Sequence, residues 1–196
     1  MEAMAGQGAM IIMGDGKHMF NSRQGDGHYR IDIGLLGTEE FAANPFDSSN
    51  HAAVKEFLLR EENFGKYSPA MQEVISQSDG PFRPWVMYYM PTDRLNWEAS
   101  SDVTLIGDAA HVTTPFVGDG VNCAMRDSVI LAEKIRELGL NKEAIAAYEA
   151  DMFPYAIDVI TRSRQSGEMF FDKNGPKTFL DVMTSGKPLI GASDGH

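Results

Sequence analysis

Two glycine-aspartate turns, placed on either side of a proline, are the residues of this sequence whose types and spacing could do chemistry. They lie in VTLIGDAAHVTTPFVGDGVNCAMRDSVILAEKI, residues 103–135. From Val121 onward, apolar or small side chains recur at the spacing of one helix face, so the second turn opens a helix. A helix N-terminus offers unpaired N–H groups and partial positive charge, and glycine lets a flat ligand approach the backbone. Asp108 would repel a phosphate but could accept hydrogen bonds from a sugar-type hydroxyl. The stretch therefore predicts a site for a polyol beside a flat, electron-accepting ring.

The other glycine pairs do not form a dinucleotide-binding fingerprint. Three pairs approach the G-x-G-x-x-G pattern: Gly6 and Gly8, Gly14 and Gly16, and Gly118 and Gly120. The first has too few residues before it for a strand, the second leads into a hairpin, and in the third Cys123 stands where a third glycine or alanine would be. We therefore see no Rossmann nucleotide site in these 196 residues.

The stretch LIGDAAHVTTPFVGDGVNCAMRDSVILA resembles the GD motif of the class A FAD-dependent aromatic hydroxylases, and most closely their tetracycline-inactivating branch. The resemblance implies that Asp108 binds the ribitol of FAD and that Pro115 lies beside the isoalloxazine ring. It further implies that the N1 and O2 edge of the flavin is held by Gly118, Gly120, Val121 and Asn122, with Gly107 completing the cofactor-binding set.

The same resemblance implies an activity. The expected enzyme is an FAD-dependent monooxygenase of secondary metabolism that uses NADPH and oxygen to hydroxylate an aromatic or polyketide-like small molecule. The cofactor carries the difficult chemistry in such enzymes, so no side chain of this chain needs to be a catalytic acid or base. The spacings of metalloprotease ligands and of a nucleophile elbow are both absent from the sequence. We predict no catalytic side chain and no metal site.

Several single residues have a structural alternative to the functional one. His111 is interpreted as a structural residue of the motif rather than a general base. Cys123 is interpreted as a small buried side chain rather than a reactive thiolate. The stretch PFRPWVMYYMP, residues 81–91, is predicted to be extended with both faces buried. Its aromatic and methionine side chains either fill a core or line a substrate pocket, for which the candidates are Trp85, Met87 and Tyr89.

The elements that position these residues suggest an α+β fold. Short β-like runs separated by glycine-rich turns predict an antiparallel meander within residues 9–36, covered by a helix within residues 48–64. Val103 to Ile106 is predicted to be a buried strand that leads into the glycine loop, followed by a helix that ends near Leu138. A further helix begins at Asn141, and Pro154 is expected to kink or split it.

These elements give a domain prediction. Residues 1–100 form a substrate-domain-like antiparallel sheet, residues 101–185 carry the flavin-side motif and C-terminal helices, and residues 186–196 form a flexible tail. The resemblance identifies this as a partial FAD-monooxygenase fold that lacks the N-terminal Rossmann unit. The sequence leaves three possibilities open: a truncated enzyme, a non-catalytic remnant or binding module, and one half of a split enzyme whose Rossmann half comes from a second chain.

The composition of the chain limits the kinds of partner that it could bind. The net charge of -11 would repel nucleic acid and anionic membranes. A single cysteine allows no intramolecular disulfide, and no apolar run reaches the length of a signal peptide or membrane span. The sequence therefore predicts a soluble cytoplasmic protein whose partner is a small molecule.

Overall fold

The computed structural model describes residues 2–43 and 47–185, and the chain divides into two compact units. Unit 1 comprises Met1–Val86 and Phe170–Phe179, and unit 2 comprises Met87–Met169 and Leu180–His196. The tail predicted for residues 186–196 lies outside the described residues. Each unit has its own core.

Unit 1 is built on a three-stranded antiparallel sheet in the order β1-β2-β3, which confirms the predicted meander. Its strands are β1 (Ala9–Gly14), β2 (Lys17–Arg23) and β3 (Tyr29–Leu35). The register pairs Ile12 with Met19 and Met19 with Ile33, so three apolar side chains share one face. That face is the one the helices cover.

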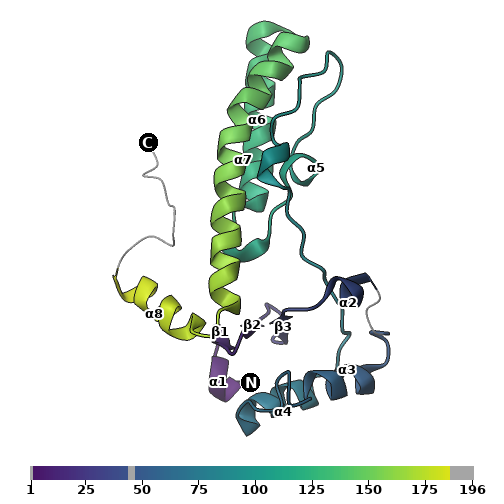
Figure 1. Ribbon diagram of the computed structural model, residues 1–196, viewed down its shortest axis with the longest axis vertical. Coiled ribbons are helices and arrows are strands. Elements are labelled where there is room, and N and C mark those ends of the chain that lie inside the picture. The colour runs from purple at the N-terminus through teal and green to yellow at the C-terminus, as the bar shows by residue number, and fades with distance from the viewer. Residues whose placement is uncertain (1, 44–46, 186–196) are drawn as a thin grey trace. The chain divides into compact units, whose positions relative to one another are not determined.

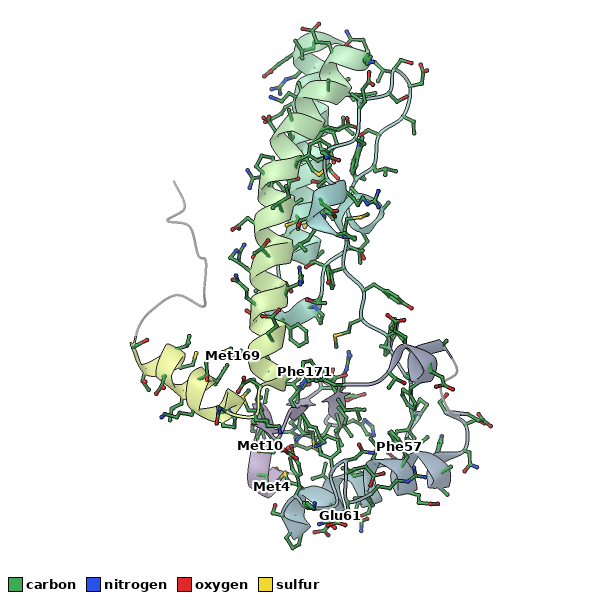
Figure 2. All side chains as sticks on the ribbon, in the orientation of Figure 1. Met4, Met10, Phe57, Glu61, Met169 and Phe171 are labelled. Carbon is green, nitrogen blue, oxygen red and sulfur yellow. The ribbon has the colours of Figure 1, made fainter. Side chains whose placement is uncertain are left out.

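The covering helices are α3 (His51–Leu58) and α4 (Pro69–Gln77), while the short α1 (Glu2–Ala5) and α2 (Glu39–Ala43) complete the unit. The predicted helix α3 is confirmed, and its Asn50 cap accepts a hydrogen bond from the Ala53 N–H at 3.1 Å. The core consists of Met19, Val54, Leu58, Phe64, Val74 and Ile75. Met4 and Phe57, labelled in Figure 2, pack against it. The sequence analysis missed α4, although Ser68 followed by Pro69 is a helix-start signal.

The opposite face of the sheet carries His18, which is buried against aromatic rings of the same unit. Its ring lies 5.5 Å from that of Phe170 and 5.0 Å from that of Phe171, centroid to centroid. Gly34 is its partner across the strands, and a Cβ added there would lie 2.0 Å from His18 Cε1. Only glycine leaves room for this ring. Burial lowers the pKa of His18, and the carboxylate of Asp32 opposes that shift in part.

This lowered pKa predicts a pH-dependent stability. The unfolded chain takes up a proton on His18 below about pH 6.5, where the folded chain resists it. Stability is therefore complete above that pH and declines below it, by at most about 1.4 kcal/mol per pH unit from this group. Urea unfolding between neutral and mildly acidic pH should show a shallower decline for His18→Gln than for the wild type. Parallel declines would refute the role of His18.

Unit 2 is built around α6 (Gly120–Leu138) and α7 (Lys142–Phe171), which run alongside each other in Figure 1. The prediction of a helix that ends near Leu138 is confirmed. Asn141 caps the next helix as predicted, because its Oδ1 accepts from the Ala144 N–H at 2.9 Å. Shorter elements are η1 (Thr92–Arg94), α5 (Asp108–His111) and η2 (Pro115–Val117), and α8 (Gly175–Ser185) follows α7. The core consists of Leu95, Ala110, Tyr148, Met152, Ala156 and Ile160.

Of the two outcomes expected at Pro154, a kink or a split, the split does not occur, since α7 continues through it from Lys142 to Phe171. A proline in a helix interior removes one hydrogen bond and costs about 3 kcal/mol. Met152 and Ala156, on either side of it, are both buried in the same core. Packing of these neighbours offsets the local cost and keeps the helix continuous.

The prediction of a buried strand at Val103–Ile106 was wrong. The segment has no regular secondary structure, and Val103, Leu105 and Ile106 are 63%, 42% and 42% exposed. A strand needs a neighbouring strand for its backbone hydrogen bonds. The three strands of the described residues pair only with one another, in the sheet of unit 1, so none of them pairs with this segment.

The prediction that both faces of residues 85–90 are buried was also wrong. Five consecutive side chains are exposed, from Trp85 at 81% to Tyr89 at 41%. The alternation of large apolar side chains does predict an extended backbone, and these residues are neither helix nor strand. It does not reveal whether this chain supplies the surface that would cover them.

The observed architecture confirms the α+β class and the antiparallel sheet. No helix within residues 2–43 or 47–185 combines the length and the hydropathy that crossing a membrane requires.

Candidate flavin site

The first glycine-aspartate turn begins at Gly107, whose backbone only glycine adopts readily. Its φ of 59° and ψ of -143° turn the chain into the short helix α5. A Cβ at this position would lie 3.2 Å from the Cβ of Ala124 on α6. The Gly107 N–H donates to Asp127 Oδ2 at 2.7 Å. The turn is therefore seated against α6 by close packing and by one buried hydrogen bond.

Asp127 is the anchor of this arrangement, and the sequence analysis missed it. Its side chain is fully buried and accepts a hydrogen bond from His111 Nε2 at 2.7 Å as well as one from the Tyr155 hydroxyl. The Arg126 guanidinium stacks over the Tyr155 ring at 4.2 Å from its centroid. A buried carboxylate persists only with such partners. His111 is 3% exposed and part of this anchor, which fits its interpretation as a structural residue.

The second turn, Gly118-Asp119-Gly120, is tied to α7 instead. Gly118 is left-handed at φ 72°, and Asp119 Oδ2 accepts from both terminal nitrogens of Arg162, at 3.2 and 3.3 Å. The loop before it is pinned by Ser163, whose hydroxyl donates to the Thr114 carbonyl at 2.5 Å. Asp119 is therefore engaged by a side chain of the protein, Arg162.

Asp108 has no such partner. Its side chain is exposed, and among the described residues nothing donates a hydrogen bond to its carboxylate. The first-turn N–H groups of α6, from Gly120 to Asn122, also lack an acceptor within the described chain. An exposed carboxylate acceptor and a set of unpaired backbone donors are therefore presented by the same unit. This donor set fits a ligand with hydroxyl groups next to a carbonyl-bearing ring.

The predicted cofactor residues differ in how far the structure buries them. Gly107 is buried and Gly120 is half-buried. The exposed members are Asp108, Pro115, Gly118, Val121 and Asn122. Exposure keeps these five accessible to a ligand, whereas Gly107 can act only by shaping the turn.

A cavity of about 610 Å³ lies between the start of α6 and the middle of α7. It is lined by Asp119, Asn122, Cys123, Arg126, Pro154, Tyr155, Asp158, Val159 and Arg162. Of the predicted cofactor residues only Asn122 lines it. The exposed group around Asp108 therefore does not coincide with this hollow.

Cys123 is buried, as the sequence suggested. Burial raises the pKa of its thiol, and the nearby carboxylates of Asp119 and Asp127 add to the shift. A thiol with a raised pKa is a poor nucleophile. Among the described residues no group of three or more His, Cys, Asp or Glu side chains is arranged to hold a metal ion.

The predicted substrate residues are exposed in the structure. Trp85 belongs to unit 1, and Met87 and Tyr89 belong to unit 2, where the Arg164 guanidinium lies 4.5 Å from the Tyr89 ring centroid. Their role in substrate binding stays a prediction.

Known proteins match the part of the chain that holds both turns. A family model described as an FAD binding domain matches residues 82–163, which include both turns. The chain is similar to the monooxygenase asqM of Emericella nidulans, with 26% identity over 94% of this chain and 53% of that protein. The monooxygenase penA of Penicillium thymicola is 23% identical over 94% of this chain and 52% of its own. A shorter match, 41% identical over 37% of this chain, is to kynurenine 3-monooxygenase of Stenotrophomonas maltophilia and covers 16% of that enzyme.

Among solved structures, HpxO of Klebsiella pneumoniae, crystallised with FAD and uric acid, matches with a TM-score of 0.66 and 23% identity. That match covers 94% of this chain and 45% of HpxO, and it concerns the fold. These matches support a resemblance to part of a class A FAD-dependent monooxygenase. It spans about half the length of the curated relatives it matches.

Proposed function

We propose that this chain provides the flavin-facing half of an FAD-dependent monooxygenase that uses NADPH and oxygen to hydroxylate an aromatic or polyketide-like small molecule. One observation carries the proposal: unit 2 presents the unpaired Asp108 carboxylate together with the unpaired N–H groups at the start of α6. The names of the relatives, all monooxygenases, support the reaction class. The uric acid bound to HpxO supports a planar ring as substrate.

The residues divide the work of holding the cofactor. Asp108 would accept hydrogen bonds from the ribitol hydroxyls, and the N–H groups of Gly120, Val121 and Asn122 would face the carbonyl edge of the ring. Pro115 and Gly118 would lie beside the ring. Bound FAD would supply the redox chemistry of the reaction.

The substrate contacts are proposed to come from Trp85, Met87 and Tyr89. Their large apolar surfaces suit a flat ring, and they are exposed rather than committed to a core.

The chain alone should bind FAD weakly. Its residues contain no strand-GxGxxG-helix unit, so the adenosine and pyrophosphate of FAD have no designed contacts here. The net charge of -11 adds a mild repulsion of the diphosphate. We therefore propose that a second polypeptide segment bearing a Rossmann fold completes the site.

Purification of the chain alone tests this. We expect no flavin absorption bands after desalting, little quenching of FAD fluorescence on titration, and little NADPH oxidation. Flavin absorption bands, quenching of FAD fluorescence and NADPH oxidation should all appear when a Rossmann-bearing polypeptide of the family is added. Tight stoichiometric FAD binding by the chain alone would contradict the need for a second segment. Absence of binding in both cases would contradict the proposed function and favour a non-catalytic binding module.

A further inference from the structure

The cavity of about 610 Å³ between α6 and α7 is distinct from the group of residues around Asp108. All the residues that line it belong to unit 2. Natural small-molecule sites have volumes of about 300–1,000 Å³ and combine apolar walls with a few polar groups. Here the apolar wall comes from Cys123, Pro154 and Val159, and the charged groups come from both helices. The cavity therefore has the size and the composition of a ligand site.

Arg162, on the α7 side of the cavity, is already matched by carboxylates. Its Nε donates to Asp158 Oδ2 at 2.8 Å, and its two terminal nitrogens donate to Asp119 Oδ2 at 3.2 and 3.3 Å. All three side chains line the cavity, and they carry two negative charges against one positive charge. This side of the cavity therefore repels an added anion, and it repels a doubly charged anion more than a singly charged one.

Arg126, on the α6 side, has no carboxylate within ion-pair distance among the described residues. Its guanidinium lies over the Tyr155 ring at 4.2 Å from the centroid. The Tyr155 hydroxyl donates to the fully buried Asp127, so the ring beneath the guanidinium is fixed. A planar guanidinium stacked on a fixed ring loses little further freedom when its N–H groups bind a ligand. Arg126 is therefore a preorganised cation at the wall of the cavity.

The chemistry of these walls favours a carboxylate. The fork of Arg126 can donate two parallel hydrogen bonds to a planar carboxylate. Asn122 lies one turn earlier on the same side of α6 and also lines the cavity, so its amide can donate to the same group. A phosphate would also match the fork, but its second negative charge would meet Asp119 and Asp158.

We infer that this cavity binds a small organic acid with one carboxylate and an apolar body. The carboxylate pairs with Arg126 and Asn122, and the body lies against Cys123, Pro154 and Val159. The site goes beyond the proposed function, since it needs neither FAD nor Asp108. Both helices line the cavity, so the bound acid contacts α6 and α7 together and stabilises unit 2 against unfolding.

Titration of the chain with benzoate, followed by the backbone amide signals in NMR spectra, is the first test. Millimolar benzoate should shift the amides of Asn122, Cys123 and Val159 and leave those of the sheet in unit 1 unmoved. Benzamide, which has no charge, and phenyl phosphate should both bind at least tenfold more weakly. No shift with benzoate, or shifts only outside the cavity, would overturn the inference. Equal or tighter binding of benzamide or phenyl phosphate would overturn it too.

Two arginines provide matched variants for the second test. Arg126→Gln should weaken benzoate at least tenfold, and Arg126→Lys should fall between it and the wild type, because lysine keeps the charge but not the fork. The control is Arg164→Gln. Arg164 also lies over an aromatic ring, 4.5 Å from the centroid of Tyr89, but it does not line the cavity. Its replacement changes the net charge equally and should leave benzoate affinity unchanged. A loss in Arg164→Gln as large as that in Arg126→Gln would overturn the inference.

Urea unfolding separates binding from folding. Arg126 is exposed, so Arg126→Gln without benzoate should unfold close to the wild type. Benzoate should raise the unfolding midpoint of the wild type and of Arg164→Gln but not that of Arg126→Gln. An equal rise in all three proteins would overturn the inference. None of these measurements uses FAD, so the proposed function can fail while benzoate still binds at Arg126, and the reverse can also occur.

Discussion

Replacing Asp127 with alanine is expected to lower the free energy of unfolding of unit 2 by about 3–5 kcal/mol. The carboxylate is fully buried and satisfies three donors, the Gly107 N–H, the His111 ring and the Tyr155 hydroxyl. Alanine removes the acceptor and leaves those donors without a partner inside the protein, which is the costly way to break a buried network. Urea unfolding followed by the fluorescence of Trp97 measures the effect, because Trp97 packs on Phe153 in the core of unit 2.

Asp151→Ala is the matched control. Asp151 lies on α7, and its carboxylate pairs with Lys134 at 2.7 Å with about half of its side chain exposed. Exposed pairs of this kind contribute about 0.2–1 kcal/mol, so the control should unfold close to the wild type. Equal losses for the two variants would contradict the anchoring role of Asp127.

The anchor explains why the first turn could be recognised from the sequence but not its support. The glycine, the aspartate and the following helix all signal themselves within a few residues, and the structure shows the turn and the helix where the pattern put them. Asp127 is a single polar residue within a helix, and nothing local distinguishes it from a solvated one. Its role depends on Gly107, twenty residues earlier in the chain, which only the folded structure brings to it.

The strands, the caps and the main helices were predictable for the same local reason. Alternation in residues 29–35 and the cap at Asn141 each reflect short-range chemistry. Burial of residues 85–90 and 103–106 was not predictable. A pattern of apolar side chains shows that a segment favours a covered position, but it cannot show that the same chain supplies the cover.

Several exposed apolar residues of this chain belong to segments that favour burial but are not covered. Val103, Val121 and Met125 belong to patterns that normally mark a core, and all are more than half exposed. Large contiguous apolar surfaces mark interaction sites in soluble proteins. For these three residues the pattern and the burial therefore disagree.

The second prediction concerns the two aspartates of the paired turns. Removing the charge of Asp108 should lower FAD affinity but not stability, whereas removing that of Asp119 should mainly lower stability. In the FAD-binding assembly, Asp108→Asn is expected to weaken FAD binding by about 10- to 150-fold, the loss of one hydrogen bond to a charged group. The free energy of unfolding of the chain should not change, because Asp108 is exposed and has no hydrogen-bond donor among the described residues.

Asp119→Asn should show the reverse pattern. It weakens the ion pair with Arg162, which is partly exposed and worth at most about 1 kcal/mol. Stability should therefore fall slightly, and FAD affinity should fall less than in Asp108→Asn, since the Asp119 carboxylate is already paired with Arg162 of α7. Fluorescence titration of FAD and urea unfolding of both variants measure the two quantities side by side. If Asp119→Asn reduced FAD affinity as much as Asp108→Asn did, the assignment of the ribitol to Asp108 would be wrong, and the second turn would have to contact the cofactor through its carboxylate.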